Sequence, residues 1–259
     1  MALRVSYNTR PFRFEDFEAT ARALARLGLR RLELHLAHFL EGGLEPAAAL
    51  AALAKHELAV ELVDGGWCDF SRGETARVPE QIALARRLGA RRLRLFFTPR
   101  SGAELGSAGL ERTSGEVARL ARENPDVELL FETHHGVGLE PECVLAILAG
   151  CGRAAPNVGL VFDPVNFAAA GRDPRAALAR LGPFVRHVHL KGARLGPPLE
   201  TCELGQGDVD LDSLLFDLLS FTSSFGIEYE GSGQALLRLL RSQEHLRRAC
   251  AARAIPLEA

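Results

Sequence analysis

Several features that mark large classes of protein are missing from this sequence. Its 31 Lys and Arg residues are balanced by 33 Asp and Glu residues, so it has no basic excess for binding nucleic-acid phosphates. It has no run of about 20 apolar residues that could span a membrane, and no apolar stretch near the N-terminus typical of a signal peptide. We therefore expect neither nucleic acid nor membrane among its partners.

Cysteine is scarce and lacks a paired pattern. There are five cysteines, an odd number, and no CxxC motif. Secreted disulfide frameworks carry even sets of cysteines, and many zinc sites carry CxxC pairs. We expect free thiols in a reducing compartment, and hence a cytoplasmic protein.

The composition is that of an ordinary globular protein. Hydrophobic residues make up 47% of the 259 residues and charged residues 25%, which excludes disordered and collagen-like chains. A chain of this length can hold a core without a disulfide or a structural metal. The length is also close to that of a (β/α)8 barrel, roughly 250 residues.

An internal sequence repeat supports a barrel. Residues 25–35 read ARLGLRRLELH and residues 86–96 read RRLGARRLRLF, identical at seven of eleven positions. Each copy has the pattern of a helix end, a glycine cap at Gly28 or Gly89, a turn and a strand. The offset of 61 residues equals two βα units of about 30 residues, although such junctions also occur in other α/β proteins.

The whole chain divides in the same way. Apolar or alternating stretches predict eight strands, at 3–7, 31–36, 58–63, 92–97, 127–132, 158–163, 185–190 and 225–230. Helical stretches follow them at 14–27, 46–55, 75–88, 110–122, 140–150, 173–181, 210–220 and 234–253. Strands that alternate with helices pair in parallel. We predict a single (β/α)8 TIM barrel over residues 1–259, with long functional loops at 64–74, 98–109 and 191–209.

Four of the later predicted strands end in side chains that can bind a metal ion. The stretches VELLF, VGLVF, VRHV and FGI lead directly to Glu132, Asp163, His189 and Glu228. A carboxylate at the end of a buried strand is costly unless it is paired, solvated or bound to a cation. In a barrel these strand ends meet at one mouth, where three carboxylates and one imidazole suit Mn²⁺, Mg²⁺, Co²⁺ or Zn²⁺.

Each of these residues alone also fits a simpler role. Asp163 precedes a proline and can be a helix N-cap, and His189 can be a partly buried core histidine. Glu132 and Glu228 can each be surface residues at strand ends. Their occurrence at the ends of four different strands favours a shared metal site.

Five motifs carry a resemblance to a known family over almost the whole chain. They are ETHHG (132–136), VGLVFDPVNF (158–167), RHVHLKG (186–192), LGQGDVDL (204–211) and GIEYEG (226–231). With them the sequence resembles the xylose isomerase-like TIM-barrel superfamily, in particular its sugar phosphate isomerase and epimerase group. In ketose 3-epimerases and hydroxypyruvate isomerases of this superfamily, four strands supply Glu, Asp, His and Glu to one divalent ion, often Mn²⁺. The resemblance implies the same roles for Glu132, Asp163, His189 and Glu228, with Glu230 as an alternative to Glu228.

The resemblance also implies proton transfer next to a carbonyl group. In such enzymes the metal chelates a carbonyl oxygen and the adjacent hydroxyl of a ketose and stabilises an enediolate. Glu132 and Glu228 are the implied catalytic residues, one removing the proton and the other returning one. Return to the same carbon is epimerisation, and return to the neighbouring carbon is aldose–ketose isomerisation. The expected protein is thus a metal-dependent isomerase of a small carbohydrate, and the resemblance allows a homo-oligomer.

Other functions occur on the same scaffold. A keto-inositol dehydratase uses the same metal but expels a β-hydroxyl group, and a catalytically silent barrel would only bind a sugar. Endonuclease IV, a DNA repair nuclease of the superfamily, has additional histidine ligands on earlier strands, where this chain ends its strands in Asp64 and Thr98.

Six further residues are candidates for binding substrate: Trp67, His134, His135, Asn166, Lys191 and Arg194. The two histidines can orient hydroxyls or form a surface pair. Lys191 can bind a hydroxyl or phosphate, or pair with a carboxylate, and Trp67 can wall the pocket or simply pack. Relatives differ here: many have Asn at Thr133, and several have His at Asn166 and Arg at Leu195, next to Arg194.

Overall fold

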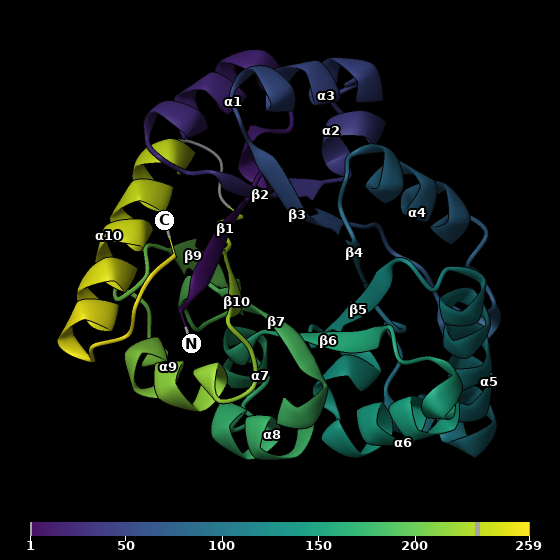
Figure 1. The fold of residues 1–259 in the computed structure, drawn as a ribbon. Helices are drawn as coiled ribbons and strands as arrows, with labels where there is room; N and C mark the ends of the chain where they lie inside the picture. Colours follow the sequence, from purple (N-terminus) through teal and green to yellow (C-terminus); the bar gives the residue numbers. More distant parts are fainter. Residues whose placement is uncertain (1, 231–233, 259) are drawn as a thin grey trace.

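Eight parallel strands close into a barrel in this computed structural model, which describes residues 2–230 and 234–258 (Figure 1). Around the ring the order is β1-β10-β7-β6-β5-β4-β3-β2. The bounds are β1 (Arg4–Asn8), β2 (Arg31–His35), β3 (Ala59–Asp64), β4 (Arg92–Leu95), β5 (Glu128–Glu132), β6 (Val158–Phe162), β7 (Val185–Leu190) and β10 (Ser224–Ile227). The predicted (β/α)8 TIM barrel is confirmed; Gly231, the last residue of the GIEYEG motif, lies outside the described residues.

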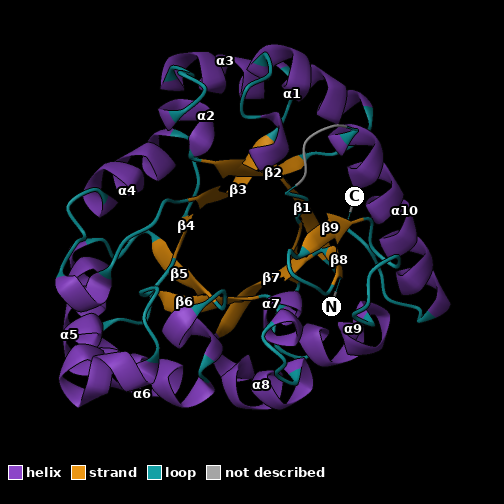
Figure 2. Cartoon of the chain, turned by 180° about the vertical axis from the view of Figure 1, so that it is seen from behind, coloured by secondary structure: helices purple, strands orange, loops and turns teal. Residues whose placement is uncertain are grey.

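Helices form an outer layer around the ring, as views from opposite sides show (Figures 1 and 2). They are α1 (Phe17–Arg26), α2 (Ala37–Leu40), α3 (Pro46–Lys55), α4 (Val78–Arg87), α5 (Gly102–Glu123), α6 (Pro141–Cys151), α7 (Pro164–Ala169), α8 (Pro174–Leu181), α9 (Leu211–Leu219) and α10 (Ala235–Ala252). In the part of the chain that the structure describes, no helix is both long and apolar enough to cross a membrane. All five cysteines are free thiols.

Local signals begin and end these helices. Asp16 accepts a hydrogen bond from the Ala19 amide and so caps the start of α1. Gly28 follows α1 with φ 76° and Gly89 follows α4 with φ 73°, a left-handed conformation that glycine adopts without strain. Both copies of the internal repeat, residues 25–35 and 86–96, are therefore helix-to-strand junctions, as expected.

The structure differs from the predicted elements in four places. The loop 98–109 is largely helical, because α5 begins at Gly102; Ser101 and Glu104 form a capping box at its start. Gly106, with φ 58°, interrupts the helical dihedrals of α5, and glycine weakens the helical signal there. Two short helices, α2 and α7, follow β2 and β6 where none was expected. The loop 191–209 contains a hairpin of β8 (Gly192–Arg194) and β9 (Glu200–Cys202).

Alternation along each strand produces two cores. Outward side chains such as Leu32, Leu93 and Phe162 pack against the helices in one continuous apolar core. The inside of the barrel holds only a small apolar cluster within the described residues, made of Leu62, Leu130 and Val161. The remaining inward positions are mostly polar.

Charged pairs fill the end of the barrel interior away from the candidate ligands. Arg92 on β4 lies 2.8 Å from Glu61 and 2.7 Å from Glu128, and it donates to the Ser224 hydroxyl at 2.9 Å. Ser224 belongs to β10, which is not a neighbour of β4, so this hydrogen bond crosses the interior. Polar side-chain contacts thus fill this end of the barrel interior and join strands that are not neighbours in the sheet.

A buried histidine beside the barrel makes stability depend on pH. His38 on α2 is 1% exposed, and its Nε2 lies 3.0 Å from the Thr9 carbonyl oxygen. Burial lowers the pKa of His38 from its ordinary value of 6.5 to about 4, against the effect of that hydrogen bond. In the unfolded chain His38 takes up a proton near pH 6.5, whereas in the folded protein it does so only near pH 4. The folded protein therefore loses stability as the pH falls from about 6.5 to about 4.

We expect the wild-type protein to lose about 2 kcal/mol of unfolding free energy through His38 between pH 7.5 and pH 5. The His38→Gln variant, whose amide can still donate to Thr9, should lack this part of the pH dependence. Urea unfolding of both proteins at the two pH values measures the difference. Equal losses in the two proteins would contradict a neutral, buried His38.

Candidate metal centre and active site

Four side chains converge at the carboxyl ends of β5, β6, β7 and β10. They are the strand-end residues Glu132, Asp163, His189 and Glu228, and all four are buried. Each offers one ligand atom, and these atoms all lie within 4.8 Å of one another. Parallel strands of a barrel bring their carboxyl ends to one mouth, so the topology accounts for this meeting.

The two carboxylate oxygens of Asp163 have different surroundings. Oδ1 accepts hydrogen bonds from the amides of Val165 at 2.8 Å and Asn166 at 3.2 Å, so Asp163 is the N-cap of α7. Oδ2 is buried without a hydrogen bond to any described residue, and it lies 2.8 Å from the Lys191 ammonium as an ion pair. The N-cap role and a ligand role are therefore compatible, because each uses a different oxygen.

His189 lies between two groups of carboxylates. Its Nδ1 is 3.5 Å from Glu132 Oε1 and 3.8 Å from Glu228 Oε2, while its Nε2 is 3.1 Å from Glu33 Oε2. Neither ring nitrogen makes a well-aligned hydrogen bond within the described residues. Nδ1 therefore faces the four-residue cluster and Nε2 faces the barrel interior.

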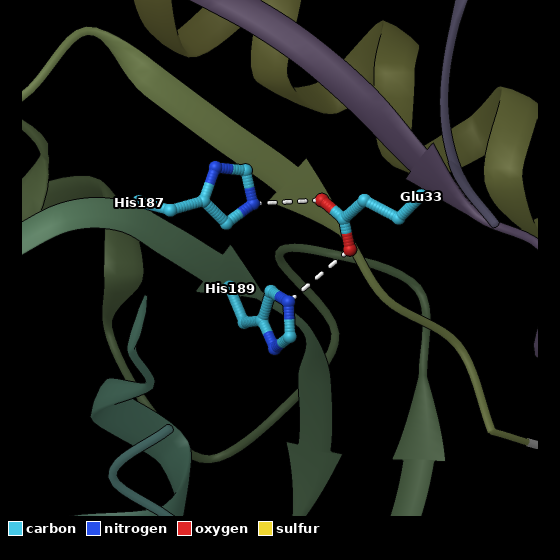
Figure 3. A group of neighbouring side chains, drawn as sticks. All are labelled: Glu33, His187 and His189. Carbon is cyan, nitrogen blue, oxygen red and sulfur yellow. Dashed lines mark hydrogen bonds and ion pairs between the residues drawn. The ribbon is translucent and has the colours of Figure 1, made fainter. Parts of the chain in front are cut away.

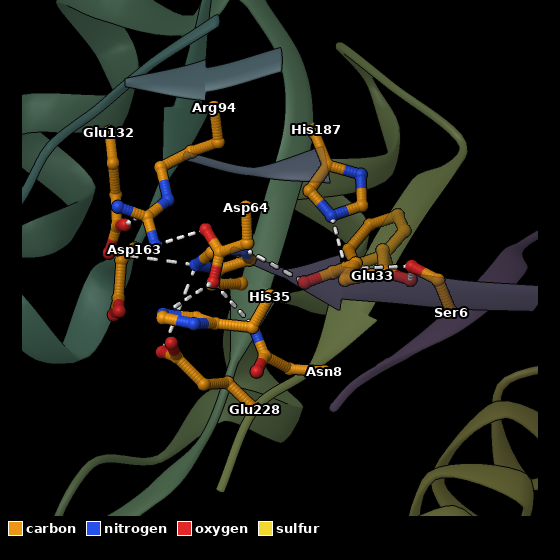
Figure 4. A network of polar contacts seen from close by, with 12 residues as sticks. Ser6, Asn8, Glu33, His35, Asp64, Arg94, Glu132, Asp163, His187 and Glu228 are labelled. Carbon is orange, nitrogen blue, oxygen red and sulfur yellow. Dashed lines mark hydrogen bonds and ion pairs between the residues drawn. The ribbon is translucent and has the colours of Figure 1, made fainter. Parts of the chain in front are cut away.

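Two buried cations offset part of the negative charge. Lys191, 1% exposed, donates a hydrogen bond from Nζ to Glu228 Oε2 at 3.1 Å. Arg94 on β4, 3% exposed, pairs with Asp64, and its Nε lies 3.3 Å from Glu132 Oε2 (Figure 4). These ion pairs offset part of the desolvation cost of the buried carboxylates when no metal ion is bound.

The charges outweigh the cost of burial at most of these positions. Burial alone would raise the pKa of Glu132, but Arg94 and His189 hold that pKa well below its ordinary value. Burial alone would lower the pKa of His189, but the surrounding carboxylates, Glu33 first, raise it well above its ordinary value. Asp163 is the exception, since burial raises its pKa despite the Lys191 ammonium.

A cavity of about 480 Å³ lies beside the cluster, a size typical of small-molecule pockets. Glu132 and Glu228 line it, together with Arg94, His35 and Glu230. Nη1 of Arg94 is buried and has no hydrogen-bond partner within the described residues. An unsatisfied donor beside a cavity marks a position for a ligand oxygen.

The aromatic candidates form a stack at one wall of this cavity. Trp67 and His134 line the cavity. The Trp67 ring lies 4.1 Å from Phe96 and 4.1 Å from His135, measured between ring centroids. Trp67 therefore packs against Phe96 and His135 while it also borders the cavity, and it remains 55% exposed.

The other candidates contact the cluster or lie away from it. Asn166 donates from Nδ2 to Glu132 Oε1 at 3.2 Å, so it contacts a candidate ligand. The Thr133 hydroxyl accepts a hydrogen bond from the Asp163 amide at 2.9 Å and ties two ligand strands together. Arg194 is exposed on β8 and is not among the described residues that line the cavity.

The inward charges on β2, β3 and β4 are not among the residues predicted from the sequence. Glu33, Asp64 and Arg94 are buried on β2, β3 and β4 (Figure 4). Glu33 contacts His187 and His189 on β7, Arg94 contacts Glu132 on β5, and Asp64 pairs with Arg94. The signal is in the alternation: RLELH (31–35) and RLRL (92–95) place leucines on one face and charges on the other. The leucine face packs on the helices, so the charged face points inward.

Comparisons with known proteins agree with this architecture. Residues 21–249 match the model of a family described as xylose isomerase-like TIM barrel. No curated protein matches the chain in sequence.

Three solved structures illustrate the shared fold. The probable 3-DHS dehydratase AsbF of Bacillus anthracis has a TM-score of 0.78 at 17% identity, over 95% of this chain and 99% of that one. An L-ribulose 3-epimerase has a TM-score of 0.73 at 16% identity, over 97% and 95%. The IolI protein with a bound zinc atom has a TM-score of 0.75 at 15% identity, over 96% and 98%. At these identities the likeness shows the fold alone.

Proposed function

The chain belongs to the xylose isomerase-like TIM-barrel family, and we propose that it is a divalent-metal-dependent isomerase or epimerase of a sugar or sugar phosphate. The observation that carries this proposal is the meeting of four ligand atoms within 4.8 Å at the barrel mouth, beside a cavity of substrate size. The free thiols suit a reducing compartment, and we propose a cytoplasmic enzyme.

The residues present fit a divalent ion. His189 Nδ1 is buried without a hydrogen bond within the described residues, and Asp163 Oδ2 has only the Lys191 ammonium at 2.8 Å, so both atoms can still serve as ligands of a cation. Three carboxylates and one imidazole, from Glu132, Asp163, His189 and Glu228, would hold Mn²⁺, with Mg²⁺, Co²⁺ and Zn²⁺ also compatible. When bound, the ion supplies Lewis acidity toward the carbonyl oxygen of the substrate.

Glu132 and Glu228 are the proposed proton carriers. Both are buried and line the same cavity, and His189 Nδ1 lies between them at 3.5 Å and 3.8 Å. One carboxylate takes the proton from the carbon next to the substrate carbonyl, and the other returns a proton to the opposite face or to the neighbouring carbon. The first outcome is epimerisation and the second is aldose–ketose isomerisation.

Neighbouring donors are placed to orient the substrate. Nη1 of Arg94 has no partner within the described residues and borders the cavity. His134 and Trp67 border it from the loops after β5 and β3. We propose that Arg94 and His134 bind substrate oxygens and that the Trp67 ring packs against the apolar face of the substrate. Lys191 holds Glu228 in place, and Asn166 holds Glu132 in place.

Deuterium exchange tests this function directly. The metal-free protein, supplied with Mn²⁺ in D₂O, should incorporate deuterium next to the carbonyl of at least one ketose or ketose phosphate, as NMR would show. A matched sample with a chelator should not. Absence of exchange in every ketose tested would contradict the proposal. A dicarbonyl product absorbing in the ultraviolet would indicate a dehydratase, and absence of both metal binding and turnover would indicate a silent barrel.

A further inference from the structure

A carboxylate from the opposite part of the barrel reaches the candidate ligand His189. Glu33 lies on β2 and His189 on β7, and both side chains are fully buried. Glu33 Oε2 is 3.1 Å from His189 Nε2 (Figure 3). Glu33 is neither one of the four candidate ligands nor, among the described residues, part of the cavity lining.

The other oxygen of Glu33 is held by two neighbours. Oε1 accepts a hydrogen bond from the Ser6 hydroxyl at 2.7 Å and lies 2.7 Å from Nε2 of His187. Nδ1 of His187 lies 2.8 Å from the Ser224 hydroxyl, which fixes that ring in turn. Because Oε1 is engaged in this way, Oε2 is the oxygen left to face His189.

The space for this carboxylate depends on a glycine. Gly226 on β10 pairs in register with His189 on β7. A Cβ atom at Gly226 would overlap the Glu33 carboxylate. Gly226 is not among the glycines with positive φ, so its small size is what the position requires. The barrel wall therefore leaves room for Glu33 at the level of His189.

We infer that Glu33 is a positioning residue for His189, an inference that rests on the proposed metal centre. The 3.1 Å contact is an ion-pair distance and not a well-aligned hydrogen bond, but a carboxylate beside Nε2 favours a proton on that nitrogen. Nδ1 then keeps its lone pair, and Nδ1 is the nitrogen that faces Glu132 and Glu228. The contact also fixes the rotation of the imidazole ring. Glu33 thus selects the tautomer and the orientation of His189 that can bind a divalent ion.

A second metal site is the competing explanation. Ligand atoms of Glu33, His187 and His189 also lie within 4.8 Å of one another. However, Oε1 already has Ser6 and His187 at hydrogen-bond distance, so this oxygen needs no ion and only Oε2 is left to face His189. The two explanations differ in stoichiometry, one ion per chain for the positioning role and two for a second site.

Mn²⁺ binding to the metal-free protein, measured by isothermal titration calorimetry, tests the inference without relying on activity. Glu33→Gln should bind Mn²⁺ about 10- to 100-fold more weakly than the wild type, the usual effect of losing such a partner of a ligand. Glu61→Gln is the matched control. Glu61 is another carboxylate inside the barrel that contacts Ser224 but not His189, and its variant should bind Mn²⁺ like the wild type.

Nitrogen-15 NMR of the histidines, with Zn²⁺ bound, gives a second measurement that a merely structural role would not move. With the ion on Nδ1 the remaining His189 proton is on Nε2, and its resonance should lie downfield in the wild type, where the acceptor is a carboxylate, and move upfield in Glu33→Gln, where the acceptor is a neutral amide. If Glu33→Gln does not fold, the same measurements are made on Glu33→Asp and Gly226→Ala. Both variants keep the negative charge of residue 33 but displace its carboxylate from His189.

The outcomes separate the inference from the proposed function. Wild-type Mn²⁺ affinity in a folded Glu33 variant would overturn the positioning role and leave the metal centre intact. Two ions per chain, with one lost in Glu33→Gln, would make Glu33 a ligand and overturn the positioning role as well. A wild-type protein that binds no divalent ion would overturn the metal centre and this inference together.

Discussion

Replacing Glu132 with glutamine is expected to slow deuterium exchange into the substrate by about 10²- to 10⁴-fold, the range for loss of a general base. The amide cannot accept the proton, and it is a poorer ligand than a carboxylate. The change is otherwise small, because a glutamine Oε1 can still accept the hydrogen bond that Asn166 donates to Glu132 at 3.2 Å. Exchange rates in D₂O with saturating Mn²⁺ measure the effect.

A residue on the same strand provides the control. Glu128 lies four positions before Glu132 on β5 and is also inward, but it pairs with Arg92 near the other end of the barrel. Glu128→Gln should exchange deuterium at the wild-type rate. If both variants lose activity equally, damage to the barrel rather than loss of a proton carrier explains the result. If neither loses activity, Glu132 is not a proton carrier.

The same assay separates Glu228 from Glu230. Glu228 is 6% exposed and belongs to the four-residue cluster, whereas the Glu230 side chain is 39% exposed and lies 3.6 Å from Lys191. We expect Glu228→Gln to match the loss in Glu132→Gln and Glu230→Gln to retain most of the exchange rate. The reverse order would assign the second proton carrier to Glu230.

The barrel is predictable from sequence because its signals are local. Strand alternation, helical periodicity and the glycines at Gly28 and Gly89 each depend on a few neighbouring residues. The order of these elements then leaves parallel pairing as the simple solution. The convergence of Glu132 and Asp163 follows from that topology. The start of α5 is harder to place, because Gly102, Gly106 and Gly109 weaken the helical pattern of its first turns, although the Ser101–Glu104 capping box marks the start locally.

The interior contacts are harder to predict, because they join residues far apart in the chain. Glu33 meets His187 across 154 positions, and no local pattern indicates that pairing. A charged residue on a short strand is also typical of a solvent-exposed face. The alternation puts Leu32 and Leu93 on the face opposite to Glu33 and Arg94, and the packing of these leucines against helices then shows that the charges point inward. Ligands at strand ends are thus visible in the sequence, whereas the residues that hold them are not.

Replacing Arg94 with methionine is expected to lower the free energy of unfolding by about 3–5 kcal/mol, the cost of removing one partner from a buried ion pair. Arg94 pairs with Asp64, which is 0% exposed. Without the guanidinium, Asp64 keeps only a hydrogen bond from Asn8 at 2.9 Å and a contact with His35 at 3.6 Å within the described residues. Urea unfolding at pH 7 in the presence of a chelator measures the loss.

A double variant shows whether the buried charge causes this loss. Asp64→Asn combined with Arg94→Met removes both charges and should recover a large part of the stability, because a neutral amide tolerates burial better than an unpaired carboxylate. Arg175→Met is the surface control, since Arg175 and Asp217 form an exposed pair, 49% and 47% accessible, that should contribute at most about 1 kcal/mol. If Arg94→Met and Arg175→Met lose equal amounts of unfolding free energy, groups other than Arg94 compensate the buried charge of Asp64. Recovery should also stay incomplete, because Nε of Arg94 lies 3.3 Å from Glu132 and the double variant leaves that carboxylate with one cationic neighbour fewer.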